Sequence, residues 1–285
     1  MIQTTVGRYV ISLVLFAMCC SGLAAQSAMP TTNILFDTRE VKFNGETGTI
    51  FPVDVDNREY WLTAKHLLTG RTSEPAGQVT EKSVSLDVLD PIGETIKWDP
   101  ADFTVIDPGK DIDIVVLVPK THLPQLPIPP LKVATGSSFF FGGECSFLGF
   151  PYATNWTVNF GSKSYRMPFI KHCYISGMTT VGSVKELVLD GINNPGFSGG
   201  PVLYNTGPNQ VVIGVIAAFY REPAQVHSIE IPETPTATNP PNKQKANRKK
   251  KENVVDLNTG IIIAFPLDAT IEAIRKNPIG QPLPK

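Results

Sequence analysis

A serine flanked by glycines is the feature of this sequence best suited to chemistry. Ser198 lies within the segment Gly196-Phe-Ser-Gly-Gly-Pro201. Glycines beside a serine permit a strained turn that projects the hydroxyl, and they let backbone N–H groups approach a reacting carbonyl. The segment therefore indicates the nucleophile of an acyl transfer, although an ordinary glycine turn would look the same in isolation.

A histidine and an aspartate supply the partners that such a serine needs. His66 ends the segment Thr-Ala-Lys-His, just after a predicted strand. Asp113 opens Asp-Ile-Val-Val-Leu117, a pattern typical of a buried strand, where a carboxylate needs a partner. Asp111 falls on the same strand face under two-residue alternation and is the competing partner. Alone, His66 would be interpreted as a surface histidine and Asp113 as a strand-end cap.

Together these motifs resemble the chymotrypsin-like serine peptidases, specifically the bacterial exported trypsin-like group. The family's Thr-Ala-x-His motif matches Thr63–His66, and its Asp-[Ile/Leu]-x-x-Leu strand matches Asp113–Leu117. Its Gly-x-Ser-Gly-Gly-Pro motif matches Gly196–Pro201. The order His, Asp, Ser is the family's order, and the resemblance covers roughly residues 40–275.

The resemblance implies a role for each residue. Ser198 is the expected nucleophile, His66 its general base and Asp113 the group that orients His66. The N–H groups of Gly196 and Ser198 are expected to form the oxyanion hole. The implied activity is that of a serine endopeptidase acting on proteins or peptides, without a cofactor or a metal. The alternative is a non-catalytic peptide-binding protein on the same fold, and an esterase is a lesser variant.

The resemblance also implies which residues shape the specificity pocket. In the family, the residue six positions before the nucleophile forms the pocket floor, and here that residue is Ile192. Phe219 stands where a glycine usually leaves the pocket open. Without a carboxylate at the floor, we expect Lys and Arg side chains to be excluded, and small or medium apolar ones to be favoured. The register stays open because residues 193–195 can bend the floor, and a one-residue slip exchanges its two faces.

Two departures from the family's pattern matter. Relatives that mature by cleavage carry an aspartate just before the nucleophile, which pairs with the new N-terminus. Phe197 occupies that position here, so we expect no such activation. The sequence also ends soon after its predicted terminal helix, so we expect no C-terminal peptide-binding module of the kind many exported relatives carry.

The composition favours an all-β protein. The 285 residues are 42% apolar and 18% charged, enough for one large or two small domains, and too apolar for a disordered chain. A net charge of -1 is too even for a nucleic-acid binder, so we expect no such partner. The 23 glycines and 25 prolines, with many short Val/Ile/Phe/Thr runs, predict β structure. Combined with the resemblance, this predicts two antiparallel six-stranded β-barrels with the active site between them and a short C-terminal helix.

Breaks in the pattern divide the chain. Residues 30–118 are predicted to form the first barrel, with the histidine and aspartate. Residues 136–277 are predicted to form the second barrel and the C-terminal helix, with the serine. Between them, prolines predict an extended linker over residues 119–135, because proline cannot donate to a sheet ladder. Residues 221–256 combine prolines and six clustered basic residues without apolar periodicity, which predicts a disordered insertion or long loop. A solvated loop is the favoured interpretation of these charges, and a site for an anionic partner is the alternative.

Residues 1–25 are predicted to be a signal peptide. Arg8 precedes an apolar run from Tyr9 to Cys20, and small residues follow, with cleavage expected after Ala24 or Ala25. The apolar run is too short for a stable transmembrane helix. We therefore expect export to the periplasm or the cell exterior without a membrane anchor after cleavage. An uncleaved anchor and a lipoprotein are the alternatives.

Two cysteines, Cys145 and Cys173, remain after this segment. An even pair in an exported protein favours a disulfide, and two buried free thiols are the alternative. Neither cysteine has the CxxC or histidine spacing of a zinc site.

Overall fold

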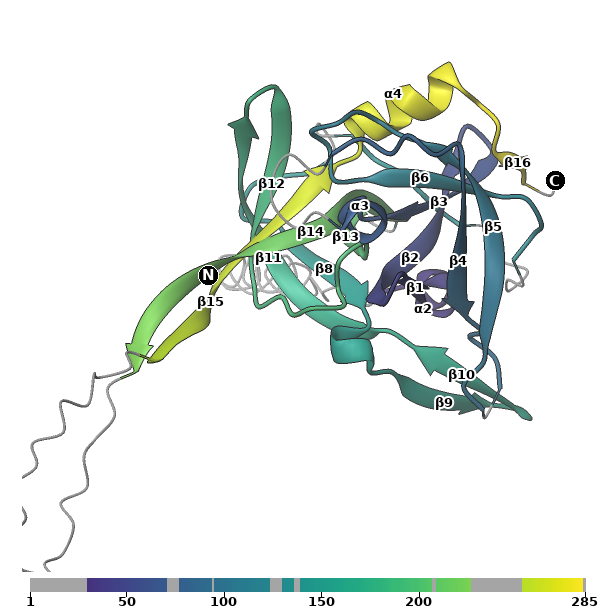
Figure 1. The fold of residues 1–285 in the computed structure, drawn as a ribbon, viewed down its shortest axis with the longest axis horizontal. Helices are drawn as coiled ribbons and strands as arrows, with labels where there is room; N and C mark the ends of the chain where they lie inside the picture. Colours follow the sequence, from purple (N-terminus) through teal and green to yellow (C-terminus); the bar gives the residue numbers. More distant parts are fainter. Residues whose placement is uncertain are drawn as a thin grey trace, which may run out of the picture.

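The computed structural model describes residues 30–70, 77–93, 95–123, 130–135, 139–206, 209–226 and 253–283. These residues form two antiparallel six-stranded β-barrels with short helices around them, which confirms the predicted fold class (Figure 1). The predicted signal peptide, residues 1–25, lies outside the described residues. In the part of the chain that is described, no helix is long and apolar enough to cross a membrane.

The first barrel closes because β2 pairs with β3 as well as with β1. Its strands are β1 (Arg39–Phe43), β2 (Glu46–Val55), β3 (Arg58–Thr63), β4 (Ser83–Leu89), β5 (Trp98–Ile106) and β6 (Val115–Pro119). Asn44 and Gly45 join β1 to β2 with φ values of 50° and 89°, the conformation that a two-residue hairpin requires. Two short strands extend the sheet: β7 (Leu131–Lys132) beside β2 and β16 (Gln281–Pro282) beside β3.

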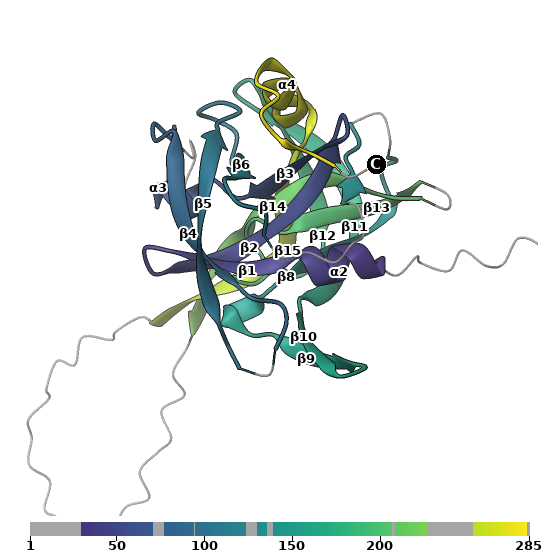
Figure 2. The ribbon, with the colours of Figure 1, turned by 90° about the vertical axis from the view of Figure 1, so that its right-hand side faces the viewer.

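The second barrel contains the remaining long strands, in the closed order β11-β12-β15-β14-β13-β8. Its strands are β8 (Glu144–Gly149), β11 (Phe169–Val181), β12 (Val184–Asp190), β13 (Pro201–Thr206), β14 (Asn209–Val226) and β15 (Asn253–Pro266). A separate hairpin, β9 (Trp156–Phe160) with β10 (Lys163–Met167), projects from it. The helical segments are α2 (Thr32–Asp37), α3 (His66–Thr69), the 3-10 turn Pro151–Ala153 and α4 (Asp268–Lys276). Both views place α4 and the β9–β10 hairpin at opposite ends of the molecule (Figure 1, Figure 2).

One continuous apolar core joins the two barrels. Buried side chains of the first barrel, such as Val53 and Ile114, belong to the same cluster as Leu148 and Val215 of the second. Burial of each such side chain contributes about 1.5–3 kcal/mol, so the barrels are held in a fixed relation by the free energy of their shared core. The cleft between them is therefore a property of the fold and does not depend on a hinge.

A disulfide joins two adjacent strands of the second barrel, as predicted. Cys145 on β8 and Cys173 on β11 are direct cross-strand partners, with their Cα atoms 5.0 Å apart, and their sulfur atoms are bonded.

Both ends of the segment 221–256, which the sequence predicts to be a disordered insertion or long loop, belong to strands. β14 and β15 stay paired from Arg221↔Asn258 out to Val226↔Asn253, and they leave the barrel as the two-stranded ribbon of Figure 1. Pro223 lies within this pairing, opposite Asp256, and a two-stranded ribbon tolerates proline because half of its N–H groups point outward and make no ladder bond. Residues 227–252 lie outside the described residues. So do residues 124–129 of the expected linker, whose ends belong to β6 and β7.

Candidate active site

His66 lies where β3 leaves the first barrel. The strand ends at Thr63, and α3 begins at His66, so the imidazole stands at the rim of the barrel. Lys65 braces this corner: its side chain is fully buried and pairs with Asp107 at 2.6 Å, and its ammonium also donates to the carbonyl of Gly109. Sequence reasoning missed this buried ion pair, because nothing in the segment distinguishes Lys65 from a surface lysine.

Asp113 binds His66 with both carboxylate oxygens. His66 Nδ1 lies 2.6 Å from Asp113 Oδ2, and the backbone N–H of His66 donates to Oδ1 at 2.8 Å. The two side chains are only 11% and 12% exposed. This two-point contact fixes the ring and places the proton on Nδ1, which leaves Nε2 as the acceptor. Asp111, the competing carboxylate, makes no hydrogen bond to His66.

Ser198 follows a tight turn over residues 194–197. The N–H of Phe197 donates to the carbonyl of Asn194 at 3.3 Å, and Gly196 has a φ of 99°. Proline at the second position and a positive φ at the third are typical of a type II turn, and Pro195-Gly196 satisfies both. A Cβ on Gly196 would lie 2.1 Å from the carbonyl oxygen of Phe150, so no other residue fits.

This turn leaves two N–H groups available. Within the described residues, neither the Gly196 nor the Ser198 N–H makes a hydrogen bond. The Pro195 carbonyl accepts the N–H of Tyr152 at 2.9 Å, and because the peptide bond is planar and trans, the Gly196 N–H must point the opposite way. Unpaired backbone donors are uncommon inside proteins, and N–H groups beside a serine are the donors that an anion-binding hole requires.

The segment Gly196–Ser198 is tied to the first barrel through Thr49 of β2. The Thr49 N–H donates to the carbonyl of Ser198 and its hydroxyl to the carbonyl of Gly196, both at 2.8 Å. The hydroxyl of Thr63 on β3 donates to the Thr49 carbonyl at 2.7 Å. These bonds set the position of Ser198 relative to His66 across the two barrels. No signal in the sequence marks Thr49, because its role depends on pairing between distant segments.

His66, Asp113 and Ser198 line one cavity of about 410 Å³ between the barrels. The first barrel also contributes Glu46 and Thr47, and the second contributes Asn194–Gly196 and Ala217–Phe219. The Ser198 hydroxyl donates to the carbonyl of Ala217 at 3.4 Å and not to His66. The structure thus brings the three sequence-predicted residues to one cleft, with the Asp–His bond formed and the Ser–His bond open.

The predicted pocket floor is wrong. The Ile192 side chain is 61% exposed and does not line the cavity. The next residue, Asn193, is buried at 2% exposed, with its amide 3.5 Å from the carbonyl of Ala218, but it does not line the cavity either. The bend before the turn thus shifts the facing by one residue. Phe219 does line the cavity, as expected.

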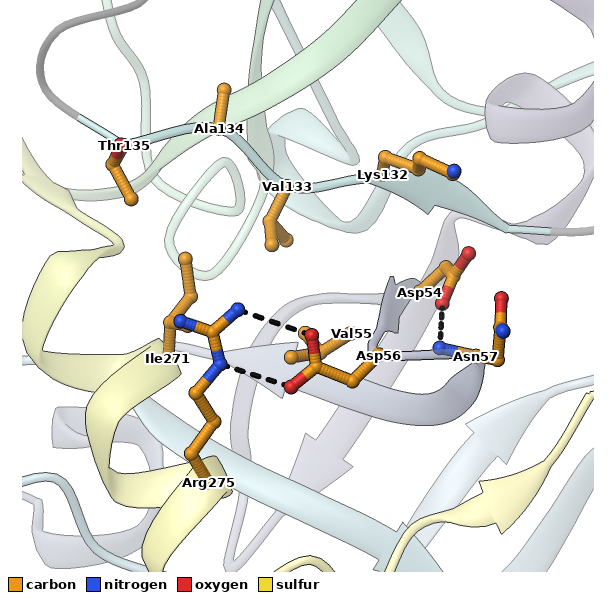
Figure 3. A pocket seen from close by; sticks show the side chains of 10 residues that line it. All are labelled: Asp54, Val55, Asp56, Asn57, Lys132, Val133, Ala134, Thr135, Ile271 and Arg275. Carbon is orange, nitrogen blue, oxygen red and sulfur yellow. Dashed lines mark hydrogen bonds and ion pairs between the residues drawn. The ribbon is translucent and has the colours of Figure 1, made fainter.

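A second cavity, of about 380 Å³, lies between the β2–β3 turn, the segment at residues 132–135 and α4 (Figure 3). Arg275 pairs with Asp56 through two bonds of 2.9 and 3.0 Å, and Asp54 accepts the N–H of Asn57. None of the residues that line it is a histidine, serine or cysteine. Among the described residues, no three His, Cys, Asp or Glu side chains are grouped to hold a metal ion.

Neither a protein-family model nor a curated protein sequence matches the chain. Solved structures are similar to it. The HtrA-type protease AlgW, determined with a tripeptide, has a TM-score of 0.50 at 15% identity, over 86% of this chain and 61% of AlgW. The inactive form of the Rv3671c protease has a TM-score of 0.46 at 16% identity, over 85% of this chain and 89% of that one. The MamO protease domain from Magnetospirillum magneticum has a TM-score of 0.46 at 14% identity, over 85% and 97%.

The likeness to AlgW, together with the two barrels, shows that the chain has the fold of the HtrA-type, trypsin-like serine proteases. The chain spans about three fifths of the length of AlgW.

Proposed function

We propose that this protein is a serine endopeptidase that uses Ser198, His66 and Asp113. The observation that carries the proposal is the grouping in one cleft of an oriented imidazole, a serine hydroxyl and two unpaired N–H donors. Acyl transfer needs these three elements together.

The mechanism follows from this geometry. His66 Nε2 accepts the Ser198 proton as the hydroxyl oxygen attacks the substrate carbonyl carbon, and Asp113 stabilises the imidazolium that forms. The N–H groups of Gly196 and Ser198 hold the resulting oxyanion. The imidazolium then gives its proton to the leaving amine, and the C–N bond breaks. Water, deprotonated by His66, attacks the acyl-enzyme, releases the acid and restores the serine.

Peptides are the substrates that this cleft fits best. The Ala217–Phe219 segment of β14 lies along the cavity, and an extended peptide can bind beside such a strand. AlgW, whose fold this chain shares, is described with a bound tripeptide. Export to an oxidising compartment belongs to the same proposal and is supported by the Cys145–Cys173 bond, because disulfides persist in such compartments.

One observation favours a second function, that of a non-catalytic peptide-binding protein. The Ser198 hydroxyl is bonded to the Ala217 carbonyl and not to His66. In an active enzyme this bond exchanges for the Ser–His bond when substrate binds, since catalytic hydrogen bonds often tighten only in the complex. In a binding protein it would persist.

Labelling with a fluorophosphonate distinguishes the two functions, because the probe reacts only with an activated serine. We expect labelling of the protein and none of Ser198→Ala. We expect His66→Ala to label far more slowly, since the hydroxyl then lacks its base. An unlabelled protein that still binds extended peptides would establish the binding function instead.

A further inference from the structure

Lys171 on β11 places an ammonium against the segment that precedes the nucleophile. Its Nζ donates to the carbonyl of Ile192 at 2.6 Å and to the side-chain oxygen of Asn194. It also lies 5.1 Å from the centroid of the Phe197 ring, within reach of a cation–π interaction. One cation thus contacts both ends of the Asn194–Phe197 turn and the residue two positions before it.

The contact with Asn194 is part of a chain of bonds that ends at the oxyanion hole. The Asn194 amide is held on both sides, because its oxygen accepts from Lys171 and its nitrogen donates to the Tyr152 hydroxyl at 3.2 Å. The backbone carbonyl of Asn194 closes the turn by accepting the Phe197 N–H. The conformation of this turn then sets the direction of the Gly196 N–H.

Lys171 has no carboxylate partner among the described residues. Partial burial lowers the pKa of its ammonium, so its position carries a desolvation cost that no ion pair offsets. Its acceptors are a carbonyl, an amide oxygen and an aromatic face, all from residues 192–197. The Lys171 side chain is long enough to extend into solvent. Its ammonium instead contacts the Asn194–Phe197 turn.

We propose that the Lys171 ammonium is a positioning group, which holds the Asn194–Phe197 turn in the form that aims the Gly196 N–H into the cleft. The proposal rests on the proposed peptidase function, because it assigns that N–H to the oxyanion. Lys171 does not touch the substrate. It acts on the transition state through the turn, so its loss reduces kcat more than it changes KM.

Three variants test the proposal. Lys171→Met keeps the length of the side chain and removes its charge, and Lys171→Arg restores a cation. Lys185→Met, an exposed lysine on the neighbouring β12, is the matched control. Peptide hydrolysis gives kcat and KM, and thermal unfolding gives stability. Hydrogen exchange followed by mass spectrometry reports the amides of Asn194 and Phe197, which are hydrogen-bonded in the intact turn.

For Lys171→Met we expect kcat to fall by about 10- to 100-fold with KM changed by less than about threefold, because small misplacement of a transition-state donor has effects of this size. Exchange should accelerate at the amides of Asn194 and Phe197 and stay unchanged in the first barrel. Lys171→Arg should recover most of kcat, and Lys185→Met should behave as the unmodified protein.

Unchanged exchange at the amides of Asn194 and Phe197 in Lys171→Met would overturn the proposal, as would an unchanged kcat. Faster exchange across the whole second barrel would also overturn it, because Lys171 would then be a packing residue. If the unmodified protein neither hydrolyses peptides nor reacts with the fluorophosphonate, the peptidase function fails. The exchange measurement then still decides whether Lys171 holds the turn.

Discussion

At the scale of single residues, the site depends on Asp113, because both of its carboxylate oxygens bind His66. Asp113 accepts from the His66 ring and from the His66 backbone N–H, so its two oxygens fix both the tautomer and the position of the imidazole. An amide at this position would keep the shape but could present its NH2 group to Nδ1. The ring would then carry its proton on Nε2, facing the serine, and could not act as a base.

Replacement of Asp113 by Asn should therefore lower kcat by roughly 10⁴-fold without unfolding the protein. Asp111→Asn is the matched control, because Asp111 lies two residues away and makes no bond to His66. Peptide hydrolysis measures the rate, and circular dichroism checks the fold. If Asp111→Asn were the inactive variant, the carboxylate would be misassigned.

At the scale of elements, the sequence predicts the positions of residues that belong to a short, contiguous motif. Glycine and proline around Ser198 are dictated by the turn itself, since a side chain at Gly196 would collide with Phe150. Prediction from a short motif fails where a bend in the backbone decides which side chain is buried. Ile192 is exposed because the bend buries Asn193 in its place. Such prediction also fails for Lys171, whose contacts form only when β11 lies beside the Asn194–Phe197 turn.

The disulfide belongs to the same scale, because it joins the adjacent strands β8 and β11. Reduction should lower the free energy of unfolding by about 2–4 kcal/mol, since the bond constrains the unfolded chain. Urea unfolding with and without reductant measures this difference.

The control for the disulfide is the Cys145→Ala/Cys173→Ala double variant, whose stability should not respond to reductant. Thiol titration of the denatured, unreduced chain lacking residues 1–25 should detect no free thiol. Two free thiols would contradict the bridge.

At the scale of the whole molecule, the cleft exists because two closed barrels share one core. His66 and Asp113 come from one barrel and Ser198 from the other, while the Thr49 bonds cross between them. Neither barrel alone can therefore assemble the site. The same arrangement gives the cleft its two walls, so in the proposed peptidase the substrate side chain would be selected by β14 and by the residues before Ser198.

That selection leads to a prediction about substrate side chains. The second-barrel residues that line the cavity include no carboxylate and include one cation, Arg221. Against this second-barrel wall, a Lys or Arg side chain would be buried without an anionic partner and beside a like charge, which costs several kcal/mol; the one carboxylate besides Asp113 that lines the cavity, Glu46, belongs to the first barrel. Phe219 lines the same cavity, and an aromatic ring leaves less room there than a glycine would. We therefore expect a peptide library to be cut after small or medium apolar residues such as Ala, Val and Leu.

Phe219→Gly should open the cavity and shift cleavage toward Phe and Tyr, because the added volume accepts an aromatic ring. Tyr220→Gly is the matched control: Tyr220 is the next residue on β14, is 53% exposed and does not line the cavity. Its library profile should match that of the unmodified protein. The difference between the library profiles of the two variants gives the effect of removing the Phe219 ring, because both variants place a glycine in the strand. Dominant cleavage after Lys or Arg in the unmodified protein would reject this account of the pocket, and an unaltered profile in Phe219→Gly would remove Phe219 from its wall.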